Sequence, residues 1–135
     1  MANTPINEQI QDLVFDLDIA TASTSANTTQ NNTSGNLFIY GGDVRIFDNA
    51  GEITEFTRGD RFEVNIQANE KNQISNSPID ARTLREMLKH PQFKGFMLLN
   101  GTNTKITVTH TPVNAAVNVA PYKVHITLFG RVGEV

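Results

Sequence analysis

The chain has 135 residues and contains no cysteine and no tryptophan, and aromatic residues make up only 7% of it. Without cysteine, no disulfide stabilises the fold and no thiol acts as a nucleophile or metal ligand. A chain of this length buries about two thirds of its unfolded surface, so it can fold without a disulfide or a metal. The scarcity of aromatic residues disfavours a stacking platform for sugars or single-stranded nucleic acid. The aromatic residues that could still serve in one are Tyr40, Phe47, Tyr122 and Phe129.

Targeting and membrane segments are also missing. No run of 18 apolar residues is present, so we expect no transmembrane helix. The segment Met1–Pro5 lacks the basic and apolar regions of a signal peptide. We therefore expect the protein in the cytoplasm, or in a virus particle if it is viral.

The formal net charge is −3, which disfavours a nucleic-acid partner because affinity for phosphates comes largely from Lys and Arg. Positively charged residues do cluster locally, and we interpret this cluster as a solvated helix face. It comprises Arg82, Arg85, Lys89, His90 and Lys94.

What the chain does contain is a series of segments with the pattern of β-strands. The clearest is Leu13–Ile19, in which apolar residues alternate with Asp16 and Asp18. Tight turns, such as the one at 48–51, indicate antiparallel pairing. The last segment is apolar on both faces, so we expect it to be central or covered by a partner. The eight predicted strands are Leu13–Ile19, Leu37–Tyr40, Val44–Phe47, Glu52–Thr57, Arg61–Gln67, Phe96–Leu99, Lys105–His110 and Tyr122–Phe129.

One helix of about 11 residues is predicted between the strands Arg61–Gln67 and Phe96–Leu99. Ser77 is a capping residue, and Pro78 suits a first helical turn. His90 precedes Pro91, which ends the helix because a residue before proline disfavours the α conformation. The apolar stripe that would pack on a sheet consists of Leu84, Met87 and Leu88.

Two other segments interrupt the strand pattern. Residues 20–35 carry no charge and nothing more apolar than alanine, so we expect a flexible polar loop inside a single domain of residues 1–135. The pair Gly41-Gly42 is expected to separate two short strands. Asn and Thr, 15 of each, suit turns and half-exposed strand positions.

Eight strands, one helix and no βαβ alternation predict an all-β protein with one short helix. The expected architecture is an antiparallel two-sheet β-sandwich, and its natural specific form is an eight-stranded single jelly roll. A barrel of five or six strands is the competing architecture if the weaker strands do not form.

Several short motifs resemble functional sites, but ordinary structural roles explain them better. Arg58-Gly59-Asp60 matches a cell-adhesion tripeptide and also an ordinary turn between strands. Asp16 and Asp18, with Asp12 nearby, lack the further oxygen ligands of a calcium site. The segment Asp48–Glu52 is shorter than an EF-hand loop and suits a hairpin turn.

Histidines and glycosylation sequons are likewise scattered. His90, His110 and His125 lack the spacing of a zinc signature, although His110 and His125 lie on late strands that could pair. The sequons, which we attribute to the Asn and Thr content, begin at Asn27, Asn31, Asn32 and Asn100. We assign no catalytic, cofactor-binding or metal-binding residue.

Many strands without recognisable chemistry favour a non-enzymatic structural protein that forms a homo-oligomer, such as a capsid or vertex component of a virion. In general character the chain is similar to the small jelly-roll capsid and vertex proteins of tailless bacterial viruses, a resemblance that implies other structural proteins as partners. The alternatives are a carbohydrate- or protein-binding β-sandwich module and a single-stranded nucleic-acid binder.

Overall fold

The computed structural model describes residues 11–20, 24–32, 35–53, 60–74, 77–112 and 121–132. One helix, α1, comprises Ala81–Lys89. The strands are β1 (Leu13–Ile19), β2 (Ser25–Asn31), β3 (Leu37–Asp48), β4 (Gly51–Glu52), β5 (Asp60–Ala68), β6 (Lys71–Asn72), β7 (Ile79–Asp80), β8 (Phe96–Leu98), β9 (Asn103–Pro112) and β10 (Tyr122–Val132). Arg58-Gly59, most of the predicted strand Glu52–Thr57 and the segment 113–120 lie outside the described residues.

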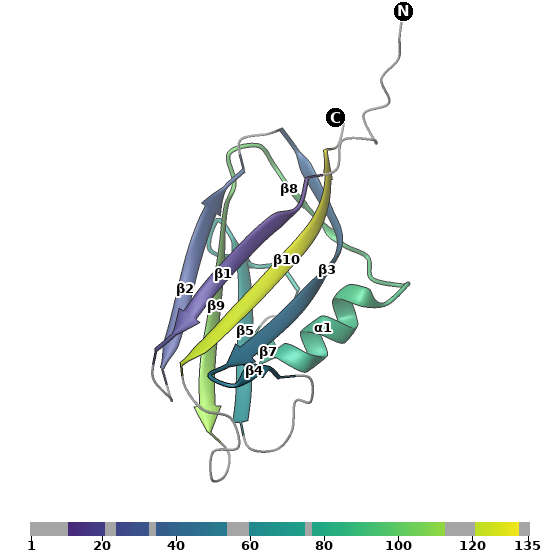
Figure 1. Ribbon diagram of the computed structural model, residues 1–135. Coiled ribbons are helices and arrows are strands. Elements are labelled where there is room, and N and C mark those ends of the chain that lie inside the picture. The colour runs from purple at the N-terminus through teal and green to yellow at the C-terminus, as the bar shows by residue number, and fades with distance from the viewer. Residues whose placement is uncertain are drawn as a thin grey trace, which may run out of the picture.

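These strands form two antiparallel sheets that pack together (Figure 1). The first sheet has the order β1-β10-β3-β4, with β8 also paired to β3, and the second has the order β2-β9-β5-β6, with β7 also paired to β5. The prediction of a mostly β protein with two antiparallel sheets and one short helix is confirmed. The last strand, β10, lies between β1 and β3, as its two apolar faces predicted.

The core lies between the two sheets and consists of the side chains at every second strand position. On β1 the apolar residues are buried and Asp16 and Asp18 are exposed, as the alternation predicted. Burying one large aliphatic or aromatic side chain stabilises the fold by about 1.5–3 kcal/mol. The largest fully buried apolar side chains are those of Phe15, Ile19, Leu37, Ile39, Ile46, Leu84, Leu98, Ile106, Tyr122, Ile126 and Leu128.

The prediction that Gly41-Gly42 separates two strands is wrong, because β3 runs without interruption through both glycines. Its register against β10 shifts at Tyr40, since Ile39 pairs with Gly130 and Gly41 pairs with Phe129. This β-bulge changes which positions face inward. Leu37 and Ile39 face the core before the bulge, and the even-numbered positions from Gly42 to Ile46 do so after it.

The prediction of a flexible loop at 20–35 is wrong for residues 25–31, which form the edge strand β2. The whole of β2 pairs with β9, from Ser25 opposite Thr109 to Asn31 opposite Asn103. Its side chains bury little surface, so the backbone hydrogen bonds to β9 supply the order that composition did not predict. The side-chain amide of Gln30 also donates to the carbonyl oxygen of Val14 on the neighbouring strand β1.

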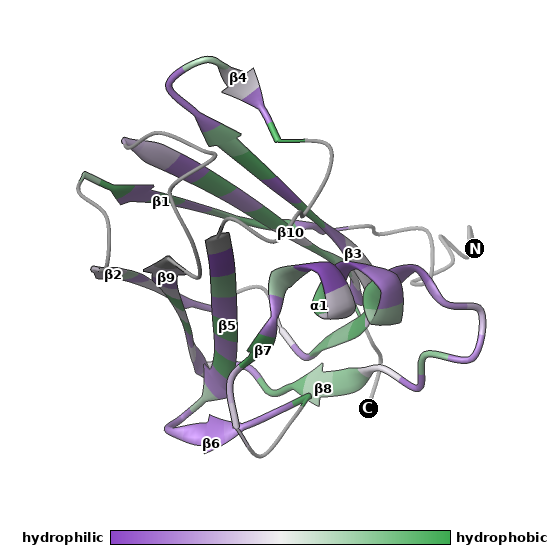
Figure 2. Ribbon diagram, turned by 90° about the horizontal axis from the view of Figure 1, so that it is seen from below, coloured by the Kyte–Doolittle hydropathy of each residue, from purple (hydrophilic) through white to green (hydrophobic). Residues whose placement is uncertain are grey.

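The helix begins later than predicted, because Ile79 and Asp80 pair with β5 as β7. The side chain of Asp80, and not that of Ser77, caps α1 by accepting a hydrogen bond from the backbone N–H of Arg82 at 3.2 Å. The helix ends before His90, which is extended as expected for a residue before proline. The helix packs against β3 and β5, and its buried residues include Leu84 and Leu88. Figure 2 shows α1 on the side of the molecule opposite β2.

Candidate functional site

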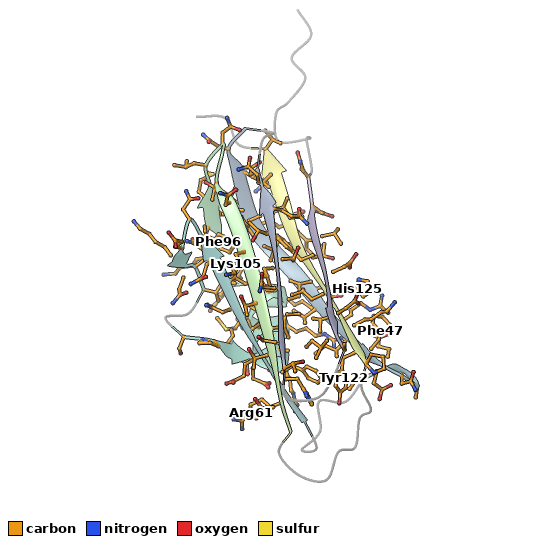
Figure 3. The ribbon with its side chains drawn as sticks, turned by 90° about the vertical axis from the view of Figure 1, so that its left-hand side faces the viewer. Phe47, Arg61, Phe96, Lys105, Tyr122 and His125 are labelled. Carbon is orange, nitrogen blue, oxygen red and sulfur yellow. The ribbon has the colours of Figure 1, made fainter. Side chains whose placement is uncertain are left out.

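The outward faces of the two sheets differ in chemistry. On the sheet of β1, β10 and β3, aromatic and charged side chains alternate with the core residues. On the sheet of β2, β9 and β5, the described outward side chains are polar and form rows across the strands. Figure 3 shows Lys105 of this face on the side opposite Phe47 and His125. These rows are Ser25–Thr109–Glu63, Asn27–Thr107–Asn65 and Thr29–Lys105–Gln67.

One end of the outer face of the first sheet carries a group that we call the aromatic patch, formed by Phe38, Tyr40, Met97, Phe129 and Arg131. The Tyr40 and Phe129 rings lie 6.2 Å apart, and the Arg131 guanidinium carbon lies 5.4 Å from the Tyr40 ring centre. Phe38 is opposite Arg131 on one side and Met97 on the other. Tyr40 is 40% exposed and Met97 is 45% exposed, so water reaches much of the patch.

At the other end of the same face, Phe47, His125 and a charged pair form a second cluster. The Phe47 and His125 rings meet edge to face at 5.3 Å, and His125 Nδ1 contacts the Asp16 carboxylate. Arg45 binds Glu52 through two hydrogen bonds, with Nη2–Oε1 at 2.7 Å and Nε–Oε2 at 3.0 Å. The hydrogen bonds that Arg45 donates to the Glu52 carboxylate raise the pKa of Arg45 and lower the pKa of Glu52.

Replacing Glu52 by glutamine is expected to make the free energy of unfolding fall less steeply as the pH is lowered. Because the folded pKa of Glu52 lies below its ordinary value of 4.5, the unfolded chain takes up the proton first. The stabilisation by the Arg45–Glu52 ion pair is therefore fully present above the pKa that Glu52 has in the unfolded chain. It is lost as the pH falls through the pKa that Glu52 has in the folded protein. Urea unfolding midpoints between about pH 6 and about pH 3 measure this difference. Glu70→Gln, in the exposed turn after β5, is the control, and identical profiles for Glu52→Gln and the unsubstituted protein would contradict the expectation.

The structure does not bring the histidines together. His110 lies on β9 in the second sheet, buried with its ring 4.9 Å from that of Phe62 and 4.6 Å from that of Tyr122. His125 lies on the outer face of the first sheet, so the idea that these two residues could pair is wrong. Across the described ranges, no group of three His, Asp or Glu side chains is placed to hold a metal ion.

Several of the other sequence candidates have structural partners. The Asp48 side chain accepts hydrogen bonds from the backbone N–H groups of Ala50 and Gly51, which confirms a turn at Asp48–Glu52. Within the basic cluster, Lys89 and Arg85 contact Asp43 at 3.1 and 3.6 Å, and Arg82 lies 4.0 Å from Glu86. Much of the positive charge of this helix is therefore paired internally.

The asparagines of the sequons differ in burial and in hydrogen bonding. Asn27 is exposed on β2, whereas Asn32 is buried where the β2–β3 and β8–β9 connections meet. The Asn32 side-chain amide donates to the carbonyl oxygens of Gly35 at 2.8 Å and Leu98 at 3.1 Å. Asn100 accepts a hydrogen bond from the backbone N–H of Gly35. These bonds tie the two sheets together at one end of the molecule.

A pocket of about 560 Å³ opens beside α1, between the helix, residues 92–96 and the chain that follows β6. Its apolar lining comes from Ile74, Met87, Phe93 and Phe96. Sequence reasoning missed both this pocket and the aromatic patch. The signal for the patch was the pair Phe38 and Tyr40, which makes one predicted strand apolar on both of its faces.

In the described residues, no helix has the length and apolar character needed to span a membrane. No protein-family model, curated protein sequence or solved structure matches this chain.

Proposed function

We propose that this protein is a non-enzymatic structural protein that assembles with copies of itself through the outer face of the β1-β10-β3 sheet. The observation that carries this proposal is the aromatic patch. Two large exposed apolar side chains, Tyr40 and Met97, lie together in this patch on one outer face, whereas the rows on the other outer face are polar. Contiguous apolar surface with a polar surround is typical of protein–protein contacts, and Tyr, Phe, Met and Arg are enriched there.

We further propose that the sandwich has the connectivity of a jelly roll. A jelly roll pairs its eight strands as nested hairpins folded over two sheets. Within the described residues, the short strands β4 and β6 each pair only with the strand directly before them and extend its hairpin, so they are set aside. The remaining eight strands pair first with last (β1·β10), second with seventh (β2·β9), third with sixth (β3·β8) and fourth with fifth (β5·β7). The additional pairs β10·β3 and β9·β5 join these hairpins into sheets. This order supports the jelly roll and distinguishes it from a simple meander.

A jelly roll with a self-association face favours a capsid or vertex component of a virus particle, since capsids are a recurrent use of this form. Lectin domains are another use, and the Asn, Thr and Gln rows on the opposite face favour them as the alternative, because hydroxyl and amide groups are natural partners for sugar hydroxyls. The two functions differ in one measurable property, the oligomeric state.

Light scattering coupled to size-exclusion chromatography, over a series of protein concentrations, tests the proposal. We expect a discrete oligomer for the unsubstituted protein. Met97→Glu, which places a carboxylate among the apolar side chains of the proposed interface, is expected to give a monomer. Thr107→Glu adds the same charge on a central strand of the other outer face and is expected to remain oligomeric. A monomer at every concentration would contradict the proposal and favour the lectin-like alternative.

A further inference from the structure

The pocket beside α1 has the properties of a small-molecule binding site. Its volume of about 560 Å³ lies within the range of about 300–1,000 Å³ that is usual for ligand pockets. Ile74, Phe93 and Phe96 are partly buried and pack on the core, so the inner wall is anchored to the fold. Met87 of α1 completes this wall with a flexible side chain that adapts to different apolar shapes.

The polar groups of the pocket decide which ligands it can hold. His90 Nδ1 accepts a hydrogen bond from the backbone N–H of Gln92 at 3.1 Å. The ring proton must therefore sit on Nε2, so that atom is a donor. Lys94 also lines the pocket and makes no ion pair within the described ranges. The two groups contribute N–H donors and a positive charge next to an apolar wall.

The carboxylate in the pocket lining has a positively charged neighbour on the same helix. Glu86, the carboxylate in the lining, lies 4.0 Å from Arg82. The end of α1 exposes carbonyl oxygens, which disfavour an anion. The N–H of His90 donates to the carbonyl oxygen of Met87, and the N–H of Phe93 donates to that of His90. Both of these carbonyl oxygens therefore already accept a hydrogen bond, whereas Lys94 brings a cation to the lining.

We propose that this pocket binds an apolar molecule that ends in a carboxylate, such as a medium-chain fatty acid or an aryl carboxylate. The apolar body lies against Met87, Phe93 and Phe96, and the carboxylate lies between His90 and Lys94. The pocket adjoins the aromatic patch, because a Cβ atom at Gly95 in its lining would lie 2.8 Å from the Phe38 ring. It shares none of the five patch residues, so the inference does not rest on the proposed self-assembly.

Isothermal titration calorimetry of the full chain with decanoate, decanol and decyltrimethylammonium, all below their micelle concentrations, tests the inference. These probes share the ten-carbon chain and differ in charge. We expect decanoate to bind most tightly and the cationic probe least tightly. Tightest binding of the cation would overturn the assignment of the ligand class, and equal affinity for all three would overturn the role of His90 and Lys94.

Substitutions locate the site. Lys94→Glu changes an exposed side chain and is expected to weaken decanoate binding about tenfold while leaving decanol unaffected. Met87→Trp, which fills the pocket, is expected to weaken both probes at least about tenfold. Lys105→Glu, on the outer face of the other sheet, is the matched control and is expected to bind like the unsubstituted protein. Unchanged decanoate affinity in Lys94→Glu would overturn the inference.

Discussion

Gly42→Ala is expected to lower the free energy of unfolding by about 3 kcal/mol or more, because the new methyl group has no room. A Cβ atom at this position would lie 2.4 Å from the carbonyl oxygen of Thr127 on the paired strand and 3.1 Å from the Leu88 side chain of α1. The Thr127 oxygen belongs to a central strand and cannot move without disturbing the sheet. Urea unfolding followed by circular dichroism measures the loss.

Gly41→Ala is the matched control for this substitution. Its Cβ would lie 3.1 Å from the carbonyl oxygen of Leu88, at the end of α1, which can shift by a few tenths of an ångström. We therefore expect a smaller loss than for Gly42→Ala, although both changes raise strand propensity equally. Equal losses, or a gain in stability for Gly42→Ala, would show that close packing at Gly42 is not what requires a glycine there.

Asn32→Ala is expected to lower the free energy of unfolding by about 2–3 kcal/mol. The substitution removes the amide that donates to the carbonyl oxygens of Gly35 and Leu98, and leaves buried acceptors without that donor. Asn32→Asp is expected to be more damaging near neutral pH, because a carboxylate would face the same carbonyl oxygens. Urea unfolding midpoints of the two variants provide the measurement.

Asn31→Ala is the control for the buried amide. Asn31 is the preceding residue and also donates, to the carbonyl oxygen of Gly101 at 3.1 Å and to Asn103 Oδ1 at 2.7 Å, but it is exposed. Water replaces these bonds when the side chain is removed, so we expect a loss of less than about 1 kcal/mol. Similar losses at both positions would contradict the importance of burial at Asn32.

The elements that the sequence predicts well are those in which one residue pattern has only one physical solution. Leu13–Ile19 alternates between apolar and charged residues, and such a pattern buries its apolar side chains only as a half-exposed strand. The end of the helix at His90-Pro91 follows from a steric restriction that holds in any fold. The turn at 48–51 likewise follows from the side-chain chemistry of Asp48.

The errors arise where partners from distant parts of the chain decide the outcome. Residues 25–31 have no apolar pattern, and they become a strand because β9, some 80 positions later, offers a row of backbone hydrogen bonds. Gly41 and Gly42 were interpreted as a break from local propensity, whereas their role is to let α1 and β10 approach β3 closely. His110 and His125 lie on successive long strands, yet these strands belong to different sheets.

The sequence by itself determined the fold class, most of the strands, the helix with its apolar stripe, and the scarcity of local catalytic or metal-binding patterns, because each of these depends on neighbours within a few residues. Only the tertiary structure decided the strand order, the bulge at Tyr40, the aromatic patch and the pocket beside α1. Each of these depends on which distant segments meet. The patch joins side chains from β3, β8 and β10, and the pocket joins α1 to residues on both sides of it in the sequence. The free energy of such contacts depends on the packing of the whole molecule, so a local sequence pattern does not predict them.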